Sequence, residues 1–146
     1  MKINEIVENR RKELGIDVVE LAKKCSLTIS GYSDIEDDET EFYMVVTLGK
    51  LITLCDELKL DLIELFGFDE CREKSSDNFI AERINKLELD VGRISDEVGI
   101  TEEAIELLIT DGQSLSNWVM DPIIDLSNIL KVNVSCLIKT INKDSH

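Results

Sequence analysis

Carboxylates are the side chains of this sequence with the most chemistry to offer. Six of the eight residues from Asp34 to Glu41 are acidic, and Glu102, Glu103 and Glu106 form a second group. Paired carboxylates can serve as general acid and base, and clustered ones can bind Ca²⁺. Glu102 and Glu106 share a helical face, but acidic pairs at this spacing are typical of an exposed surface. The first run lacks the ligand spacing and central glycine of a calcium loop, so we predict no catalytic pair and no metal site.

Cysteine and histidine add little to this inventory. Cys25, Cys55, Cys71 and Cys136 are far apart, with no Cys-x-x-Cys pair, and the one histidine is His146. No internal histidine is therefore available to activate a serine or cysteine nucleophile or to complete a metal site. We expect a protein that is not an enzyme, has no cofactor and keeps its cysteines as reduced thiols. Cys25 and Cys55 are expected in the core, and Cys71 is expected to be the most exposed.

The charge balance limits the partners. The chain has 31 acidic and 16 basic residues, a formal net charge of −15. This excess repels phosphate backbones and anionic lipid surfaces over about 10 Å at ordinary salt, and it attracts basic proteins. No apolar run is long enough for a membrane span, and the segment after Met1 is too charged for a signal peptide. We therefore predict a cytoplasmic protein with no membrane partner, for which nucleic acid is an unlikely partner.

The elements that must position these residues are helices. Only one proline, Pro122, and seven glycines interrupt 146 residues, and apolar residues recur every three or four positions, which predicts an all-α fold. Asp17, Asp61 and Thr101 are expected to cap helix starts, and Pro122 fits the first turn of its helix. The expected helices are Ile3–Leu14, Val18–Lys24, Thr28–Ile35, Val45–Leu58, Asp61–Phe66, Ile80–Leu89, Val91–Val98, Thr101–Ile109, Asp121–Leu130 and Ser135–Ile141.

A polar segment interrupts the helical pattern. Residues 67–78 (GFDECREKSSDN) lose the apolar periodicity and collect turn-forming residues. We interpret them as a linker between two domains, residues 1–66 and 79–146, of about five short helices each. Apolar residues beside the linker, Phe66, Phe68 and Phe79, are expected to close the domains against each other.

The two halves also resemble each other at a nearly constant offset along the chain. Leu54–Leu65 aligns with Leu126–Leu137, and Leu21–Thr28 aligns with Ile94–Thr101 one residue out of step. Because the apolar positions match, we interpret the chain as two repeats, with one residue inserted in a loop.

The first repeat carries the pattern of a known DNA-binding motif: a Gly-apolar start, a Leu-Ala pair, an apolar turn, a recognition helix and a closing helix pair. These parts are Gly15-Ile16-Asp17, Leu21-Ala22-Lys23-Lys24, Ser26-Leu27-Thr28, Ile35-Glu36 and Leu51–Phe66. The second repeat matches through Ile94-Ser95, Val98-Gly99-Ile100-Thr101 and Leu126–Ile138. The chain thus resembles the lambda-repressor-like, or Cro-like, helix-turn-helix family, as two degenerate acidic repeats.

The DNA-contacting positions of that family are changed here. In the family, a Gln at the start of the second helix meets the phosphate backbone, and the recognition helix presents polar and basic side chains to DNA. Val18 stands where that Gln is expected, Ile29 stands where a polar residue is common, and Gly31 weakens the recognition helix. DNA-binding proteins commonly use roughly six to ten basic phosphate contacts. Asp34, Asp37, Asp38 and Glu39 instead occupy positions that are often basic or small in the family, and these acids would repel a duplex.

The change from basic to acidic side chains at these positions suggests that the scaffold has become an acidic protein-binding surface. We expect it to neutralise a basic protein partner, such as a toxin nuclease, as immunity proteins, antitoxins and nucleic-acid mimics do. Aromatic residues, Phe42 among them, are expected to anchor the partner because tyrosine is enriched at binding hot spots. The partner-binding candidates are Tyr32, Asp34, Glu36, Asp37, Asp38, Glu39, Glu41, Tyr43, Glu102, Glu103 and Glu106.

Other interpretations of the same residues stay open. The acidic run is also compatible with a solvated loop, and Trp118 with either core packing or an interface anchor. The alternative function is a helix-turn-helix transcriptional regulator that dimerises and binds DNA through the basic cluster Arg10-Arg11-Lys12. A scaffold protein without inhibitory role is a third possibility, and the sequence leaves a homodimer open.

Overall fold

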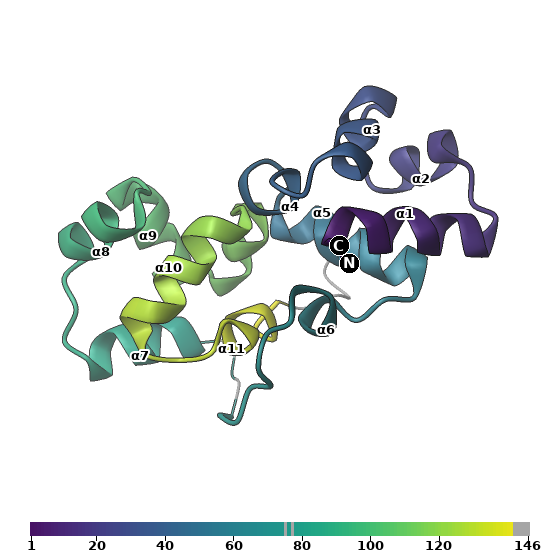
Figure 1. The fold of residues 1–146 in the computed structure, drawn as a ribbon. Helices are drawn as coiled ribbons and strands as arrows, with labels where there is room; N and C mark the ends of the chain where they lie inside the picture. Colours follow the sequence, from purple (N-terminus) through teal and green to yellow (C-terminus); the bar gives the residue numbers. More distant parts are fainter. Residues whose placement is uncertain (75, 77, 142–146) are drawn as a thin grey trace.

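Helices form nearly all the regular structure in the computed structural model, which describes residues 1–74, 76 and 78–141 (Figure 1). Within these ranges we find no strand beyond an isolated bridge between Thr47 and Val119, so the predicted all-α fold is confirmed. Ser75 and Asp77 of the expected linker, and residues 142–146 with His146, lie outside the described residues. The first half contains α1 (Ile3–Leu14), α2 (Val18–Lys24), α3 (Ile29–Asp37), α4 (Glu41–Met44), α5 (Leu48–Leu58) and α6 (Leu62–Phe66).

The second half has the same order of elements. It contains α7 (Phe79–Lys86), α8 (Val91–Val98), α9 (Glu102–Thr110), the 3₁₀ helix η1 (Gly112–Asn117), α10 (Met120–Leu130) and α11 (Val134–Ile138). Helices α8 and α9 follow α2 and α3 at one common offset, whereas α10 and α11 follow α5 and α6 at an offset that is shorter by a single position. The extra residue of the first half therefore lies between α3 and α5, where η1 takes the place of α4.

Equivalent helix ends share their backbone geometry. Lys59 and Lys131 end α5 and α10 in the left-handed conformation, with φ of 56° and 57°. The last carbonyls of a helix have no partner within it, and an arginine from the first helix of each half supplies one. These bonds join Arg10 Nε to the Leu58 carbonyl at 2.9 Å and Arg83 Nε to the Leu130 carbonyl at 2.8 Å.

Capping residues set the starts of several helices. The Asp61 carboxylate accepts hydrogen bonds from the backbone N–H groups of Ile63 and Glu64, and Thr101 accepts one from Ala104, as the sequence predicts. Asp17 holds the expected N-cap position of α2 without a side-chain cap bond. The short elements α4 and η1 were not predicted, and α5 begins at Leu48 rather than at Val45. A four-residue helix carries too little periodicity to be recognised.

The two halves meet through a self-complementary contact. Thr47 pairs with Val119, which is its equivalent in the second half, and the Leu48 N–H donates to the Trp118 carbonyl at 2.8 Å. Helix α5 packs against η1, and its equivalent α10 packs against α4. The second-last helix of each half therefore packs against the short helix of the other half. Two identical subunits meet in the same way in a two-fold dimer.

Phe66 belongs to a cluster of aromatic side chains. Its ring lies against those of Phe42, Tyr43 and Phe68, an arrangement that aromatic rings favour. Phe66 and Phe68 also pack against the common apolar core, to which Phe79 belongs. That these three residues close the two halves against each other stays a prediction.

Residues 67–78 are attached to α11 where the structure describes them. The Asp69 and Glu70 carbonyls accept hydrogen bonds from Ser135 Oγ at 2.6 Å and Asn133 Nδ2 at 3.0 Å. Beside these bonds a disulfide joins Cys71 to Cys136, with the Cα atoms 4.8 Å apart. The prediction of reduced thiols is therefore wrong for this pair. Cys71 is half-buried, whereas Cys25, Cys55 and Cys136 are buried, so Cys71 is the most exposed of the four, as predicted. The two cysteines are 65 residues apart in sequence, so only the tertiary fold brings them together.

Among the described helices, none combines the length and the apolar character that a membrane crossing requires.

Candidate functional site

The stretches of chain that hold α3 and α9 contain no basic residue. No Lys, Arg or His occurs in residues 25–49, which hold α3, or in residues 94–130, which hold α9. The first stretch contains six acidic residues and the second contains eight. Helices α3 and α9 lie toward the upper side of the molecule in Figure 1, near its two ends. Both of these surfaces are consequently negative at pH 7.

Helix α3 presents its acids through simple helical geometry. Thr28 caps the helix by accepting a hydrogen bond from the Gly31 N–H at 2.9 Å, and Ile35 points into the core. Asp34 and Asp37 lie on the solvent side and are exposed. Asp38 ends the helix, and its exposed carboxylate accepts a hydrogen bond from the Thr40 N–H at 2.9 Å, which lowers the pKa of this carboxyl.

Two predicted contact residues of α3 are instead internal. Tyr32 is 0% exposed, and its hydroxyl donates a hydrogen bond to the Glu36 carboxylate. Arg11 of α1 donates to the same carboxylate through Nε at 2.7 Å and Nη2 at 3.1 Å. Tyr32 and Glu36 therefore hold α3 against α1 and are not free to contact a partner.

The pKa values of this cluster follow from burial and from the two hydrogen-bonding partners of Glu36. Burial, and then the bond to Glu36, raise the pKa of the Tyr32 hydroxyl far above its ordinary value. Burial alone would raise the pKa of the Glu36 carboxyl, but the bonds from Arg11 and Tyr32 outweigh it and hold this pKa below its usual range. The cluster therefore contains an ionised carboxylate, an ionised guanidinium and a neutral phenol at pH 7.

The remaining candidates near α4 also serve the fold. Glu39 accepts a hydrogen bond from the Ile3 N–H at 2.9 Å and so satisfies an open donor at the start of α1. Phe42 is 0% exposed. The half-buried Tyr43 packs edge-on against Phe66, with ring centroids 5.2 Å apart, and Glu41 is half-buried as well. The expected aromatic anchors thus belong largely to the core.

Helix α9 keeps all of its predicted contact residues on the surface. Glu102, Glu103 and Glu106 are exposed, and none of them forms an ion pair with another residue that the structure describes. Glu102 and Glu103 lie in the first turn, where the positive end of the helix dipole stabilises negative charge. Their carboxylates are consequently available to an external cation.

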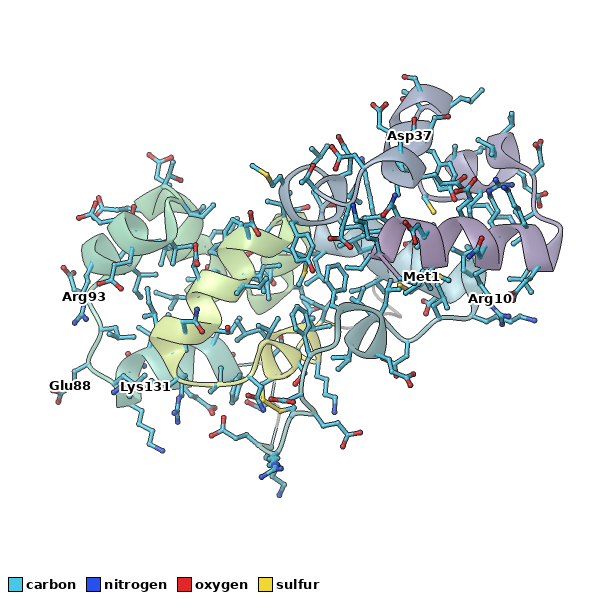
Figure 2. The ribbon with its side chains drawn as sticks, in the orientation of Figure 1. Met1, Arg10, Asp37, Glu88, Arg93 and Lys131 are labelled. Carbon is cyan, nitrogen blue, oxygen red and sulfur yellow. A yellow bond between two sulfur atoms is a disulfide. The ribbon has the colours of Figure 1, made fainter. Side chains whose placement is uncertain are left out.

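The basic cluster required by the DNA-binding alternative is engaged within the chain. Arg11 holds Glu36 in the buried cluster, and Arg10 satisfies the end of α5 and pairs with Glu13 at 3.1 Å. The exposed Lys12 pairs with Glu8 at 3.0 Å. Figure 2 shows Arg10 pointing away from α3, whose exposed Asp37 lies on another side of the molecule.

The structure contains one feature beside α9 that the sequence did not predict. A solvent-open hollow of about 460 Å³ is lined mainly by apolar groups from α9, η1 and the start of α10. Leu107, on its edge, is 52% exposed, whereas Trp118 is buried at 7%. The lining includes Ile100, Ala104, Leu107, Trp118, Val119 and Pro122. An available signal was Leu107 itself, which follows the acidic Glu106 on the solvent side of the helix.

Thiol and metal chemistry find little support in the described residues. Burial raises the pKa of the Cys25 thiol to about 11, so at pH 7 it is protonated and a weak nucleophile. No cluster of three or more His, Cys, Asp or Glu side chains suited to a metal ion occurs in the part of the chain that is described.

Comparison with known proteins gives no relative: no family model, no curated protein and no solved structure matches this chain.

Proposed function

We propose that this chain is a non-enzymatic binding protein that neutralises a basic protein partner. It consists of two tandem lambda-repressor-like helix-turn-helix domains, whose α3 and α9 surfaces bind the partner's cations. The observation that carries this proposal is the absence of basic residues from residues 25–49, which hold α3, and from residues 94–130, which hold α9. The repeated order of helices supports the assignment of both domains to one scaffold.

Electrostatics favours a protein partner over DNA at these surfaces. DNA affinity depends largely on Lys and Arg, which neutralise phosphates and release counterions, with roughly six to ten such contacts in many complexes. Neither stretch supplies a basic residue. A net charge of −15 instead accelerates encounter with a basic protein and disfavours acidic competitors.

The internal contacts of the basic cluster count against the alternative of a DNA-binding regulator. Arg11 would have to leave a buried carboxylate, which costs several kcal/mol as an order of magnitude. Arg10 would have to abandon the Leu58 carbonyl. Lys12 alone can turn outward cheaply, because its pair with Glu8 is exposed.

The partner class follows from the chemistry of the surface. An acidic face on a helical scaffold fits a protein whose own site binds phosphates, such as a toxin nuclease. Binding there would exclude the nucleic acid, which is how immunity proteins, antitoxins and nucleic-acid mimics act. The contact residues under this proposal are Asp34, Asp37 and Asp38 on α3, and Glu102, Glu103 and Glu106 on α9.

Charge reversal on each surface tests the proposal. We would measure binding to a cationic ribonuclease by fluorescence anisotropy, using a labelled chain and two double variants. These are Asp34→Lys with Asp37→Lys, and Glu103→Lys with Glu106→Lys. We expect at least one of them to weaken binding about tenfold or more at low salt, since several charge pairs are lost and some repulsion is gained.

The matched control is a double reversal at exposed first-turn acids outside the proposed surfaces, Glu5→Lys with Glu82→Lys. It changes the net charge equally but leaves α3 and α9 intact. The proposal predicts a smaller effect for this control. Equal weakening by all three variants would mean that only net charge matters and would refute the assigned surfaces.

A further inference from the structure

The hollow beside α9 differs from its surroundings by being apolar. It has a volume of about 460 Å³, with Ala104, Leu107 and Pro122 among its lining residues. Trp118 forms part of the wall, although most of its side chain is covered. The hollow is open to solvent, so it can receive a side chain from a macromolecule without any opening motion.

The apolar character of this hollow is not required by the fold. The equivalent of Leu107 in the first half is Asp34, and the equivalent of Pro122 is Lys50. The same scaffold therefore tolerates charged side chains at both places. Leu107 and the lining of the hollow form continuous apolar surface that is open to solvent, and such surface is typical of binding sites.

Exposed acidic residues lie close in the sequence to residues that line the hollow. Glu103 and Asp111 lie one helical turn before and after Leu107, and Asp121 directly precedes Pro122. All three acids are exposed. Because no basic residue occurs between Arg93 and Lys131, no nearby cation of that stretch neutralises this rim.

We propose that the hollow receives an apolar side chain from a basic segment of the partner, while the acidic rim binds the lysines or arginines that flank it. The preferred ligand is thus an amphipathic basic polypeptide segment rather than a uniformly basic one. An apolar anchor inside a polar rim is the usual arrangement of a binding hot spot. This inference rests on the proposed function and adds a specificity site to it.

Trp118 provides the readout, because it is the only tryptophan of the chain and lines the hollow. Three tryptophan-free peptides would be titrated at low salt while Trp118 emission and binding are followed. The first has leucines every three or four positions and lysines elsewhere, the second is an oligolysine of equal charge, and the third has glutamine in place of each lysine. We expect the first to bind about tenfold tighter than either of the others and to be the one that shifts Trp118 emission.

Leu107→Asp separates the hollow from general electrostatics. It removes the apolar edge but adds negative charge, and Asp34 at the equivalent position indicates that the fold accepts it. We expect about tenfold weaker binding of the leucine–lysine peptide, consistent with loss of part of a leucine's burial, and unchanged or tighter binding of oligolysine. Val19→Asp is the matched control, because Val19 is 50% exposed and lies on α2, away from the hollow. Ala104→Leu, which fills the hollow without a change of charge, is expected to weaken the same peptide.

The outcomes are distinguishable. If both lysine peptides bind equally and Leu107→Asp behaves like Val19→Asp, the hollow is not a binding site, but the acidic surface stands. Equal binding of the glutamine peptide would overturn the role of the rim. If neither lysine peptide binds at low salt, the proposed function itself fails, and this inference fails with it.

Discussion

The buried cluster of Arg11, Glu36 and Tyr32 makes a strong prediction about stability. The Arg11 and Glu36 side chains are 13% and 10% exposed, and two hydrogen bonds join them. Removing one partner of a buried pair leaves an uncompensated charge, a loss of about 3–5 kcal/mol when the pair is fully buried. Because some water reaches this pair, we expect Arg11→Met to lower the free energy of unfolding by about 2–3 kcal/mol.

A double-mutant cycle tests whether the loss comes from this pair. Glu36→Gln removes the charge that Arg11 neutralises, so the double variant should be less destabilised than the sum of the single variants. Urea unfolding followed by circular dichroism gives these free energies. The exposed pair of Lys12 and Glu8 is the control, and Lys12→Met should cost less than about 0.5 kcal/mol.

The same cluster predicts a pH dependence. Because the pKa of folded Glu36 lies below its ordinary value, the stability it contributes is present above the unfolded pKa of about 4.3. That contribution is lost as pH falls through the folded pKa. The stability difference between wild type and Glu36→Gln should therefore shrink from pH 6 toward pH 3. A difference independent of pH, or an Arg11→Met effect no larger than that of Lys12→Met, would refute this explanation.

Three further predictions concern a helix cap, the disulfide and the oligomeric state. Asp61→Ala should lower the free energy of unfolding by about 1 kcal/mol because two N–H groups lose their acceptor. Asp17→Ala should cost less, since the Asp17 side chain makes no cap bond. Urea unfolding of both variants measures this difference. Cys71→Ser should cost up to about 4 kcal/mol by the loop-entropy relation for a 65-residue separation, and reductant should destabilise wild type but not this variant. The chain should be a monomer of 16.5 kDa by light scattering, because its self-complementary contact is used internally; twice that mass would contradict this.

Local signals in the sequence predicted most helices. Apolar periodicity placed α1, α2 and α8 with the bounds that the structure has, since each has enough turns to define a buried face. Capping chemistry identified Asp61 and Thr101 as helix starts. Residue types alone did not define α4 and η1, whose paths depend on the packing of one half against the other.

The candidate site was predicted less well, because acidic residues were not separated by helix face. Glu36 follows Tyr32 by one turn and therefore shares its inward side, next to Ile35. The helical spacing of Tyr32 and Glu36 could have shown that both side chains point inward. The sequence did not show that Arg11 is the partner that neutralises Glu36, because Arg11 lies 25 residues away. The disulfide depends likewise on a tertiary approach between distant segments, and so does the hollow beside α9.

The choice between a basic protein partner and DNA is tested most directly by titrating the labelled chain with duplex DNA and, separately, with a cationic ribonuclease. Anisotropy would be followed at about 50 mM salt, where electrostatic attraction is strong. We expect no binding to DNA even under these conditions, and saturable binding to the ribonuclease that weakens as salt rises. Saturable binding to DNA with a steep salt dependence would contradict this expectation and would favour a DNA-binding regulator that uses Arg10, Arg11 and Lys12.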